Sequence, residues 1–306
     1  RMDANPSRTS QARNDDDWPA PGIFGFVWHM ISSQFFFFVT YFFQHFWVNA
    51  KPKTDYSHKL LVIGDGVAAG FGDYATCIAP PGLTRHLSRI LRREVSVRTY
   101  WTLLNCGVFG STSDDWHPEC KHAPDNVRAY GRILGTIHNF FGSSRPLWRQ
   151  IFGDPRFKDV EIVLICVGLN DSKFGSDTKS AKKTQENIKA MCLELESKGI
   201  EVIVSTIPLR WRLRGKETSA SSSVPFNLFD ADKRRNCLIA SFAEEQEGVY
   251  LGVDLGSPGY NRHKLYCADA VHFSSAGYTK WASDLRDVLV PAMVRVEAKT
   301  WKSILK

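Results

Sequence analysis

The sequence lacks several features that mark other classes of protein. It has no Cys-x-x-Cys pair, and its 7 cysteines stand at irregular spacings, which argues against a secreted disulfide framework and against a structural zinc site. No stretch interleaves basic and aromatic residues, although the formal net charge is +7, so nucleic-acid binding is not expected. These absences favour an ordinary globular protein with reduced thiols and a mildly basic surface.

Two short stretches that could hold ligands are incomplete as motifs. His117, Cys120 and His122 have the spacing of metal ligands, but no second cluster follows them, so a surface loop is expected there. The stretch from Gly70 to Asp73 lacks the Lys-Ser/Thr pair of a phosphate-binding loop. We therefore expect neither a metal nor a cofactor.

A long segment without charged residues lies near the amino terminus. From Pro19 to Ala50 there is no Asp, Glu, Lys or Arg, and residues 23–48 are rich in aromatic side chains. A helix over residues 23–48 would span about 39 Å at about 1.5 Å per residue, more than the ~30 Å hydrocarbon core of a bilayer requires. Polar residues interrupt it, namely His29, Ser32, Ser33, Gln34, Gln44 and His45. A membrane-spanning helix, an interfacial helix and a helix packed on its own domain all stay open.

The charges around this segment predict an orientation. Lys51, Lys53 and Lys59 follow it, whereas Arg8 and Arg13 precede it among aspartates. The positive-inside rule then places the main domain on the cytosolic side of a membrane, in agreement with reduced cysteines. The predicted parts are a polar tail at 1–22, a membrane-spanning or interfacial helix at 23–48, a linker at 49–58 and one domain at 59–306.

In that domain, strand-like and helix-like segments alternate. The expected strands are residues 59–63, 95–104, 160–167, 201–207 and 249–255. The expected helices are residues 84–93, 125–140, 178–198, 228–246 and 274 to about 296. This alternation predicts an α/β domain in which helices cover both faces of a parallel sheet. A ligand site is then expected at the carboxyl ends of the strands.

Four short stretches fall after strands and contain candidate site residues. They are Gly64-Asp65-Gly66, "NCGVFGSTSDD" with Gly110, "VGLND" with Asn170, and "DAVHF" with Asp269 and His272 just before the last helix. Taken singly, each is commonly structural, because glycine turns after strands are frequent. Their order along successive strands predicts that they converge at one edge of the sheet.

On these blocks the sequence resembles the SGNH hydrolase family, also called GDSL-type esterases and lipases, over roughly residues 59–290. The resemblance implies a flavodoxin-like, three-layer α/β/α fold with a mostly parallel five-stranded sheet. It implies hydrolysis of acyl or acetyl esters of small-molecule, lipid or carbohydrate substrates. It also implies His272 as general base, Asp269 as its orienting acid, and an oxyanion hole formed by the N–H groups of Gly66 and Gly110 and the side chain of Asn170.

One position departs from the pattern of that family. The nucleophile is expected to be the serine of Gly-Asp-Ser, and this sequence has Gly66 there. Without a hydroxyl, no acyl-enzyme can form at residue 66. Three explanations stay open: a pseudo-hydrolase that binds its ligand without turnover, a replacement nucleophile among Ser111, Thr112 and Ser113, or a glycine substituted into a normal esterase. We expect a weak or inactive ester hydrolase, with a non-catalytic, membrane-associated binding module as the alternative.

Overall fold

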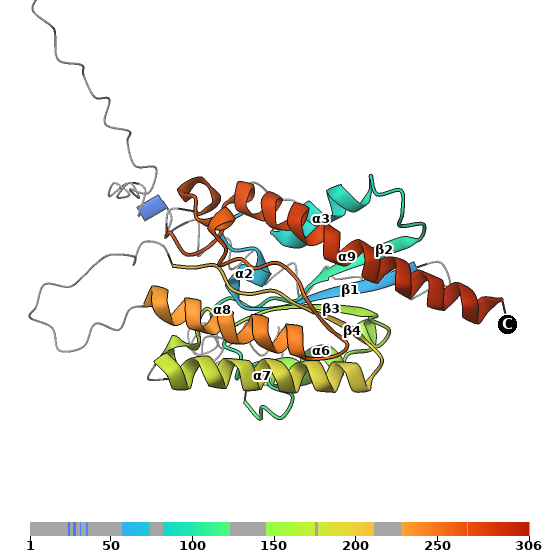
Figure 1. The fold of residues 1–306 in the computed structure, drawn as a ribbon, viewed down its shortest axis with the longest axis horizontal. Coiled ribbons are helices and arrows are strands. Elements are labelled where there is room, and N and C mark those ends of the chain that lie inside the picture. The colour runs from blue at the N-terminus through green and yellow to red at the C-terminus, as the bar shows by residue number, and fades with distance from the viewer. Residues whose placement is uncertain are drawn as a thin grey trace, which may run out of the picture.

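The computed structural model describes residues 57–73, 82–122, 145–174, 177–210, 228–267 and 269–305, together with Phe24, Val27, Trp28, Ile31 and Phe35 (Figure 1). The domain is built on five parallel strands in the order β2-β1-β3-β4-β5. The strands are β1 (Ser57–Gly64), β2 (Tyr100–Asn105), β3 (Ile162–Cys166), β4 (Glu201–Val204) and β5 (Val249–Leu251). The predicted parallel sheet is therefore confirmed, and β1 begins inside the stretch predicted as linker.

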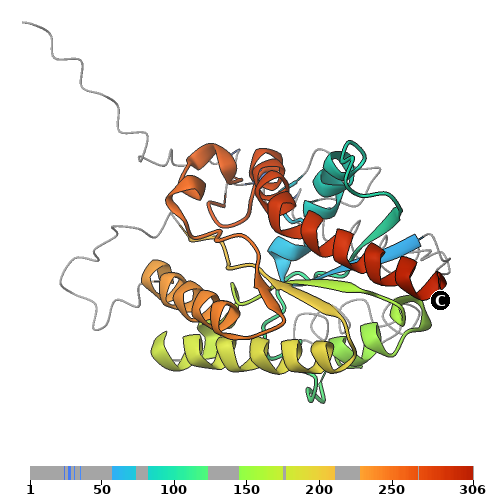
Figure 2. The ribbon, with the colours of Figure 1, turned by 45° about the vertical axis from the view of Figure 1, so that its right-hand side comes forward.

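Both faces of the sheet are buried, which explains why its strands are almost entirely apolar. Along β1, Leu60 and Val62 pack on one face while Leu61 and Ile63 pack on the other, each with 0% exposure. The first face is covered by α3 (Leu83–Leu91) and α9 (Ser275–Ile304). The second face is covered by α6 (Leu147–Phe152), α7 (Asp177–Ser197) and α8 (Leu228–Glu245), so the three layers are seen in Figure 2. Single turns complete the fold: α2 (Gly66–Ala69), η1 (Pro155–Phe157), η2 (Asp171–Phe174), η4 (Pro258–Tyr260) and η5 (His263–Leu265).

Because all strands are parallel, their carboxyl ends share one edge of the sheet, here called the carboxyl edge. The short helix α2 marks it at the end of β1, at the left of Figure 1. The opposite, amino edge contains the starts of the strands and the loop between α3 and β2, and the carboxyl terminus extends past it on the right.

The structure shortens the predicted second strand and lengthens the last helix. Residues 95–99 lie outside β2, and Val95 is 89% exposed. The N–H groups of Arg98 and Thr99 each donate to the Glu297 carboxylate at 3.1 Å, so a side chain takes the place of a neighbouring strand. The same carboxylate accepts from Trp101 Nε1 at 3.0 Å, and α9 continues to Ile304 while it supplies this contact. The predicted helix at 125–140 lies outside the described residues.

Two strands also end earlier than predicted, and beyond their ends hydroxyl side chains form hydrogen bonds beside the remaining backbone ones. β4 and β5 end at residues 204 and 251. Beyond them, Ser205 Oγ accepts from the Val253 N–H at 3.2 Å, and Thr206 Oγ1 accepts from the Leu255 N–H at 2.7 Å.

The predicted membrane segment, residues 23–48, lies largely outside the described residues. Its five described residues are helical, and their exposure ranges from 47% for Val27 to 91% for Phe24. Among the residues that the structure describes, no helix is both long and apolar enough to cross a membrane. The six described cysteines are free thiols, and three of them, Cys106, Cys166 and Cys192, are buried.

Candidate active site

The first loop of the carboxyl edge is a tight turn fixed by a buried carboxylate. β1 ends at Gly64 with a φ of 143°, and a Cβ there would lie 1.8 Å from a backbone oxygen of β3, so only glycine fits. Asp65 then caps α2, since its Oδ1 accepts from the Val67 N–H at 3.0 Å. Its Oδ2 accepts from the N–H groups of Gly168 and Leu169 at 3.2 and 3.0 Å. Asp65 therefore joins the loop after β1 to the loop after β3.

This burial gives Asp65 a distinctive titration. Burial raises its pKa from 3.8 to about 6, and the donors Val67 and Leu169 offset only part of the effect. A carboxyl group with a higher pKa in the folded state holds its proton more tightly there, so its contribution to stability is lost as pH rises from 3.8 to about 6. Over that window we expect the free energy of unfolding to fall by about 3 kcal/mol from this group. Urea unfolding should show a flatter pH dependence for Asp65→Asn, and equal slopes for both proteins would contradict the assignment.

The turn before α9 contains His272, whose ring is held by a hydrogen bond to Asp269. His272 Nδ1 lies 2.6 Å from Asp269 Oδ2. The other oxygen, Asp269 Oδ1, accepts from the N–H groups of Val271 and His272 at 2.9 and 3.0 Å and from the Cys267 thiol at 2.9 Å. With the carboxylate fixed and Nδ1 donating to it, Nε2 of His272 is the free acceptor of the ring. This is the arrangement that a general base requires.

The Nε2 nitrogen of His272 faces Gly66, the residue predicted to stand at the nucleophile position. A Cβ placed on Gly66 would lie 2.9 Å from His272 Nε2 and 3.0 Å from Phe109 Cδ2. Since a Cβ lies about 2.5 Å from its own nitrogen, Nε2 is within about 5.4 Å of the Gly66 amide nitrogen. The ring centroid of His272 is 4.5 Å from that of Phe71 and 5.9 Å from that of Phe109. The imidazole of His272 is thus directed at the backbone of Gly66 between aromatic neighbours.

The predicted oxyanion donors come from loops that touch one another. Gly110 has a φ of 75°, a conformation that favours glycine, and it turns the loop after β2. Asn170 Nδ2 donates to the Ser111 carbonyl oxygen at 2.8 Å, which places the amide beside the residue that follows Gly110. Phe109, which precedes Gly110, is the side chain closest to Gly66 after His272. The structure therefore brings Gly66, Gly110 and Asn170 to one place.

The three hydroxyls considered as replacement nucleophiles are occupied elsewhere. Ser111, Thr112 and Ser113 are at most 2% exposed. Ser111 Oγ donates within 3.2 Å to the carbonyl oxygens of Gly64 and Val108 and accepts from an indole N–H at 3.0 Å. Thr112 Oγ1 and Ser113 Oγ each donate to a carboxylate, at 2.7 and 2.5 Å. These contacts fix the loop after β2 and turn its hydroxyls away from the role of attacking group.

Asp171, a residue for which no role was predicted, joins two of the site loops. It is 0% exposed, and its Oδ1 accepts from the Ser113 N–H at 2.9 Å. Its Oδ2 accepts from the hydroxyls of Ser113 and Thr184 at 2.5 and 2.6 Å. Burial raises the pKa of Asp171 above its usual range. Because Asp171 directly follows Asn170, this carboxylate clamp holds the loop of Gly110 and the loop of Asn170 in register.

The cluster of possible metal ligands at His117, Cys120 and His122 is a locally bonded loop. His117 Nδ1 accepts from the Glu119 N–H at 3.1 Å, and the Cys120 thiol donates to the His122 carbonyl oxygen at 3.4 Å. Within the described part of the chain, no group of three or more His, Cys, Asp or Glu side chains could hold a metal ion.

Comparison with known proteins agrees with this geometry. The model of the family described as "GDSL-like Lipase/Acylhydrolase family" matches residues 62–280, which include all four loops of the site. The chain belongs to the GDSL-like lipase/acylhydrolase family. The predicted family of esterase-type hydrolases is therefore confirmed.

Solved structures similar to this GDSL-like protein are distant in sequence. One is the lipase/acylhydrolase from Enterococcus faecalis, with 17% identity over 79% of this chain and 96% of that chain and a TM-score of 0.48. Another is an acetylxylan esterase from Geobacillus stearothermophilus, with 14% identity over 78% of this chain and 96% of that chain and a TM-score of 0.46. No curated protein matches the chain.

Proposed function

We propose that this GDSL-like protein binds acyl or acetyl esters at the carboxyl edge and hydrolyses them slowly, by direct attack of water. The supporting observation is that His272 Nε2 faces Gly66 while Nδ1 is held by Asp269 at 2.6 Å. In this scheme, water adds to the ester carbonyl carbon as Nε2 takes its proton. The oxyanion accepts from the N–H groups of Gly66 and Gly110 and from Asn170. The intermediate then expels the alcohol, which receives its proton from His272.

The reaction is slow because the covalent route is missing. Gly66 has no side-chain oxygen that could form an acyl-enzyme. The reaction therefore cannot be divided into two easier steps, acylation and deacylation. A site that retains only its base and oxyanion hole accelerates hydrolysis by about 10³ to 10⁴ over water.

The proposal is tested with p-nitrophenyl acetate, a short aryl ester. We expect a small rate above the buffer rate, with no initial burst, and at least about a tenfold loss of that rate in His272→Ala because the general base is removed. Stopped-flow absorbance measures both the burst and the steady rate. A burst of one equivalent in the unaltered protein would point to a hidden nucleophile, and an unchanged rate in His272→Ala would remove the proposed base.

A second candidate is a binding module that performs no chemistry. The observation in its favour is the crowding at Gly66, where His272 and Phe109 leave a Cβ only 2.9 and 3.0 Å of room. Calorimetry with a methyl ketone analogue of the ester distinguishes the two candidates. Binding of the analogue together with a hydrolysis rate equal to that of His272→Ala supports the module, whereas a rate that depends on His272 supports the weak hydrolase.

The apolar segment at residues 23–48 adds a membrane location to this proposal. Its described residues, Phe24, Val27, Trp28, Ile31 and Phe35, are apolar, helical and between 47% and 91% exposed. Exposed apolar side chains on a helix are typical of a segment whose partner is a lipid surface. The lysines that follow the segment support a cytosolic main domain.

A further inference from the structure

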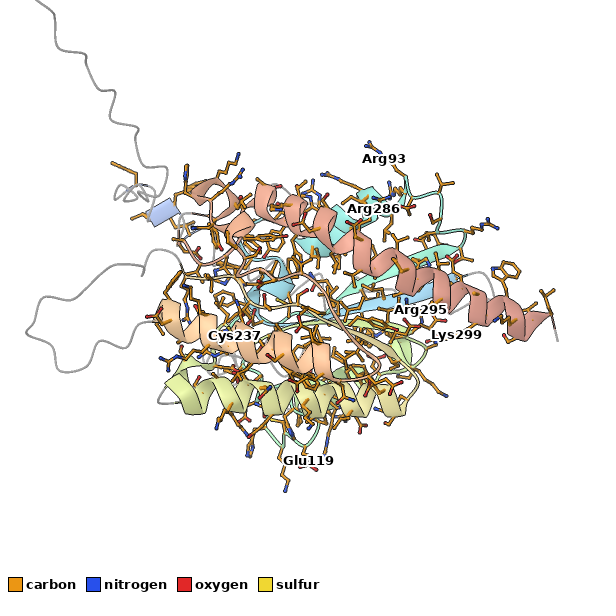
Figure 3. All side chains as sticks on the ribbon, in the orientation of Figure 1. Arg93, Glu119, Cys237, Arg286, Arg295 and Lys299 are labelled. Atoms are coloured by element: carbon orange, nitrogen blue, oxygen red, sulfur yellow. The ribbon has the colours of Figure 1, made fainter. Side chains whose placement is uncertain are left out.

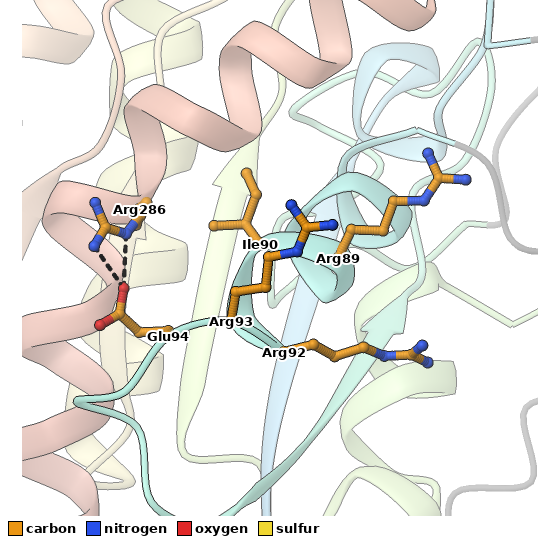
Figure 4. Close-up of a pocket in the computed structure, with 6 residues that line it drawn as sticks. All are labelled: Arg89, Ile90, Arg92, Arg93, Glu94 and Arg286. Atoms are coloured by element: carbon orange, nitrogen blue, oxygen red, sulfur yellow. Dashed lines mark hydrogen bonds and ion pairs between the residues drawn. The ribbon is translucent and has the colours of Figure 1, made fainter.

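A groove lined by arginines lies at the end of the molecule away from the site loops. Its volume is about 580 Å³, and its lining comes from the end of α3, the residues after it, and α9, as the close-up in Figure 4 shows. The lining residues are Arg89, Ile90, Arg92, Arg93, Glu94 and Arg286. Because α3 is followed by the loop into β2, this groove belongs to the amino edge of the sheet. We call the exposed side chains of Arg89, Arg92 and Arg93 the arginine edge.

The charge of the arginine edge is not matched inside the groove. Glu94 is the one acidic residue of the lining, and it already pairs with Arg286 at 2.7 Å. The stretch 85–98 has five arginines and one glutamate, so the sequence around the groove adds positive charge. Part of this pattern stabilises the carboxyl end of α3 through the helix dipole, but three arginines exceed what that role requires.

The shape of the arginine edge favours a broad partner over a single small anion. In Figure 4 the guanidinium groups of Arg89, Arg92 and Arg93 lie apart and do not converge on one point. A site for one phosphate would instead gather several donors around it. Separated cations fit a surface on which many anionic groups are spread.

Exposed apolar side chains accompany the arginines. Val95, two residues after Arg93, is 89% exposed, and Tyr100 at the start of β2 is 67% exposed. The end of α9 is tied to this loop through Glu297 and presents Leu305, which is 82% exposed. Arg93, Arg286, Arg295 and Lys299 are labelled in Figure 3. Arg286 pairs with Glu94, and Arg295 and Lys299 pair with Glu201, so the charge available to a partner comes from the arginine edge. Basic residues beside exposed apolar ones are typical of surfaces that dock on anionic lipid.

The arginine edge supplies a charge that the apolar segment near the amino terminus lacks. The segment from Pro19 to Ala50 has no Asp, Glu, Lys or Arg, so at neutral pH it cannot by itself distinguish anionic from neutral lipid.

We propose that the arginine edge docks on an anionic membrane surface, with its guanidinium groups on lipid headgroups and Val95 and Tyr100 in the interfacial layer. This contact adds a charge-dependent term to any binding by residues 23–48. It does not depend on the chemistry of the ester pocket, so a failure of either proposal leaves the other standing.

The test measures partition of the full chain onto two kinds of vesicle by co-sedimentation. One kind is phosphatidylcholine alone, and the other contains about one third phosphatidylserine. The readout is the ratio of the two partition coefficients, which cancels the contribution of the uncharged segment. Each basic residue near an anionic surface raises the partition coefficient by about fivefold. The variant Arg89→Gln/Arg92→Gln/Arg93→Gln should therefore lower the ratio by about 100-fold.

Two further variants keep this test decisive. Lys182→Gln/Lys183→Gln/Lys189→Gln removes the same charge from exposed positions of α7 in the other layer, and it should change the ratio by less than about twofold. Arg89→Lys/Arg92→Lys/Arg93→Lys keeps the charge and should keep the ratio. An unchanged ratio in the glutamine variant of the arginine edge overturns the proposal. An equal fall in the α7 variant overturns it too, since net charge alone would then explain the binding.

Discussion

Replacing Gly66 by serine should raise the rate of ester hydrolysis by about 10² to 10³-fold, because in the proposed mechanism it adds the covalent route to a site that has its base and oxyanion donors. The new Cβ would start 2.9 Å from His272 Nε2, closer than a carbon normally approaches, so the imidazole has to shift by a few tenths of an ångström. His272 has limited freedom for this, since Asp269 and the ring of Phe71 hold it. We therefore expect a large gain that stays below the rate of a fully evolved serine esterase.

The matched control for this gain is Gly66→Ala. Alanine adds the same Cβ beside His272 and Phe109 but no oxygen, so its rate should stay at or below that of the unaltered protein. Initial rates with p-nitrophenyl acetate, together with mass spectrometry of the acetylated intermediate, measure the effect. An acetyl adduct on residue 66 should appear in Gly66→Ser alone. Equal rates in the serine and alanine variants would show that this position does not take part in the chemistry.

Removing the Asp171 carboxylate should weaken both the fold and the proposed oxyanion hole. Asp171→Ala leaves the buried Ser113 N–H and the Ser113 hydroxyl without their acceptor, while the Thr184 hydroxyl keeps the Ser180 carbonyl oxygen at 3.0 Å. We expect a cost of about 3 kcal/mol in the free energy of unfolding. In the Gly66→Ser background, kcat should fall by about 10²-fold, since misplacing one oxyanion donor costs about that much. Urea unfolding and steady-state kinetics measure the two effects.

The control for Asp171 separates positioning from simple destabilisation. Asp171→Asn keeps one oxygen for the Ser113 N–H, and the hydroxyls can rotate to accept from its amide, so we expect a smaller loss of both stability and kcat. Asp171→Ala could instead retain full kcat under conditions where it is folded. In that case the carboxylate clamp stabilises the domain and does not set the geometry of Asn170 and Gly110.

Most of the fold, and the residues that lie together at the candidate site, could be predicted from the sequence. Alternating strands and helices predicted the parallel sheet, and the turns after its strands predicted where Gly66, Gly110 and Asn170 would meet. The spacing of three between Asp269 and His272 was enough to predict their hydrogen bond, because both lie in one turn. Such local features can be predicted from the sequence because they depend on residues close together in the chain.

Contacts between distant residues were not predictable in the same way. Glu297 captures the N–H groups of Arg98 and Thr99 across almost 200 positions, and no local pattern in residues 95–99 excludes a strand. Likewise, the burial of Ser113 depends on Asp171, which lies 58 positions away. The sequence showed hydroxyls beside Gly110 but could not show that their hydrogen bonds were already committed.

The approach of His272 to the bare backbone of Gly66 has a consequence for how such a protein is detected. Fluorophosphonate probes, which label serine hydrolases across whole proteomes, form their bond to an activated hydroxyl oxygen, and residue 66 has none. Profiling with these probes should therefore pass over this chain, even though its architecture is that of their targets. A search for hydrolases by fold will include this protein, whereas a search by covalent labelling will not.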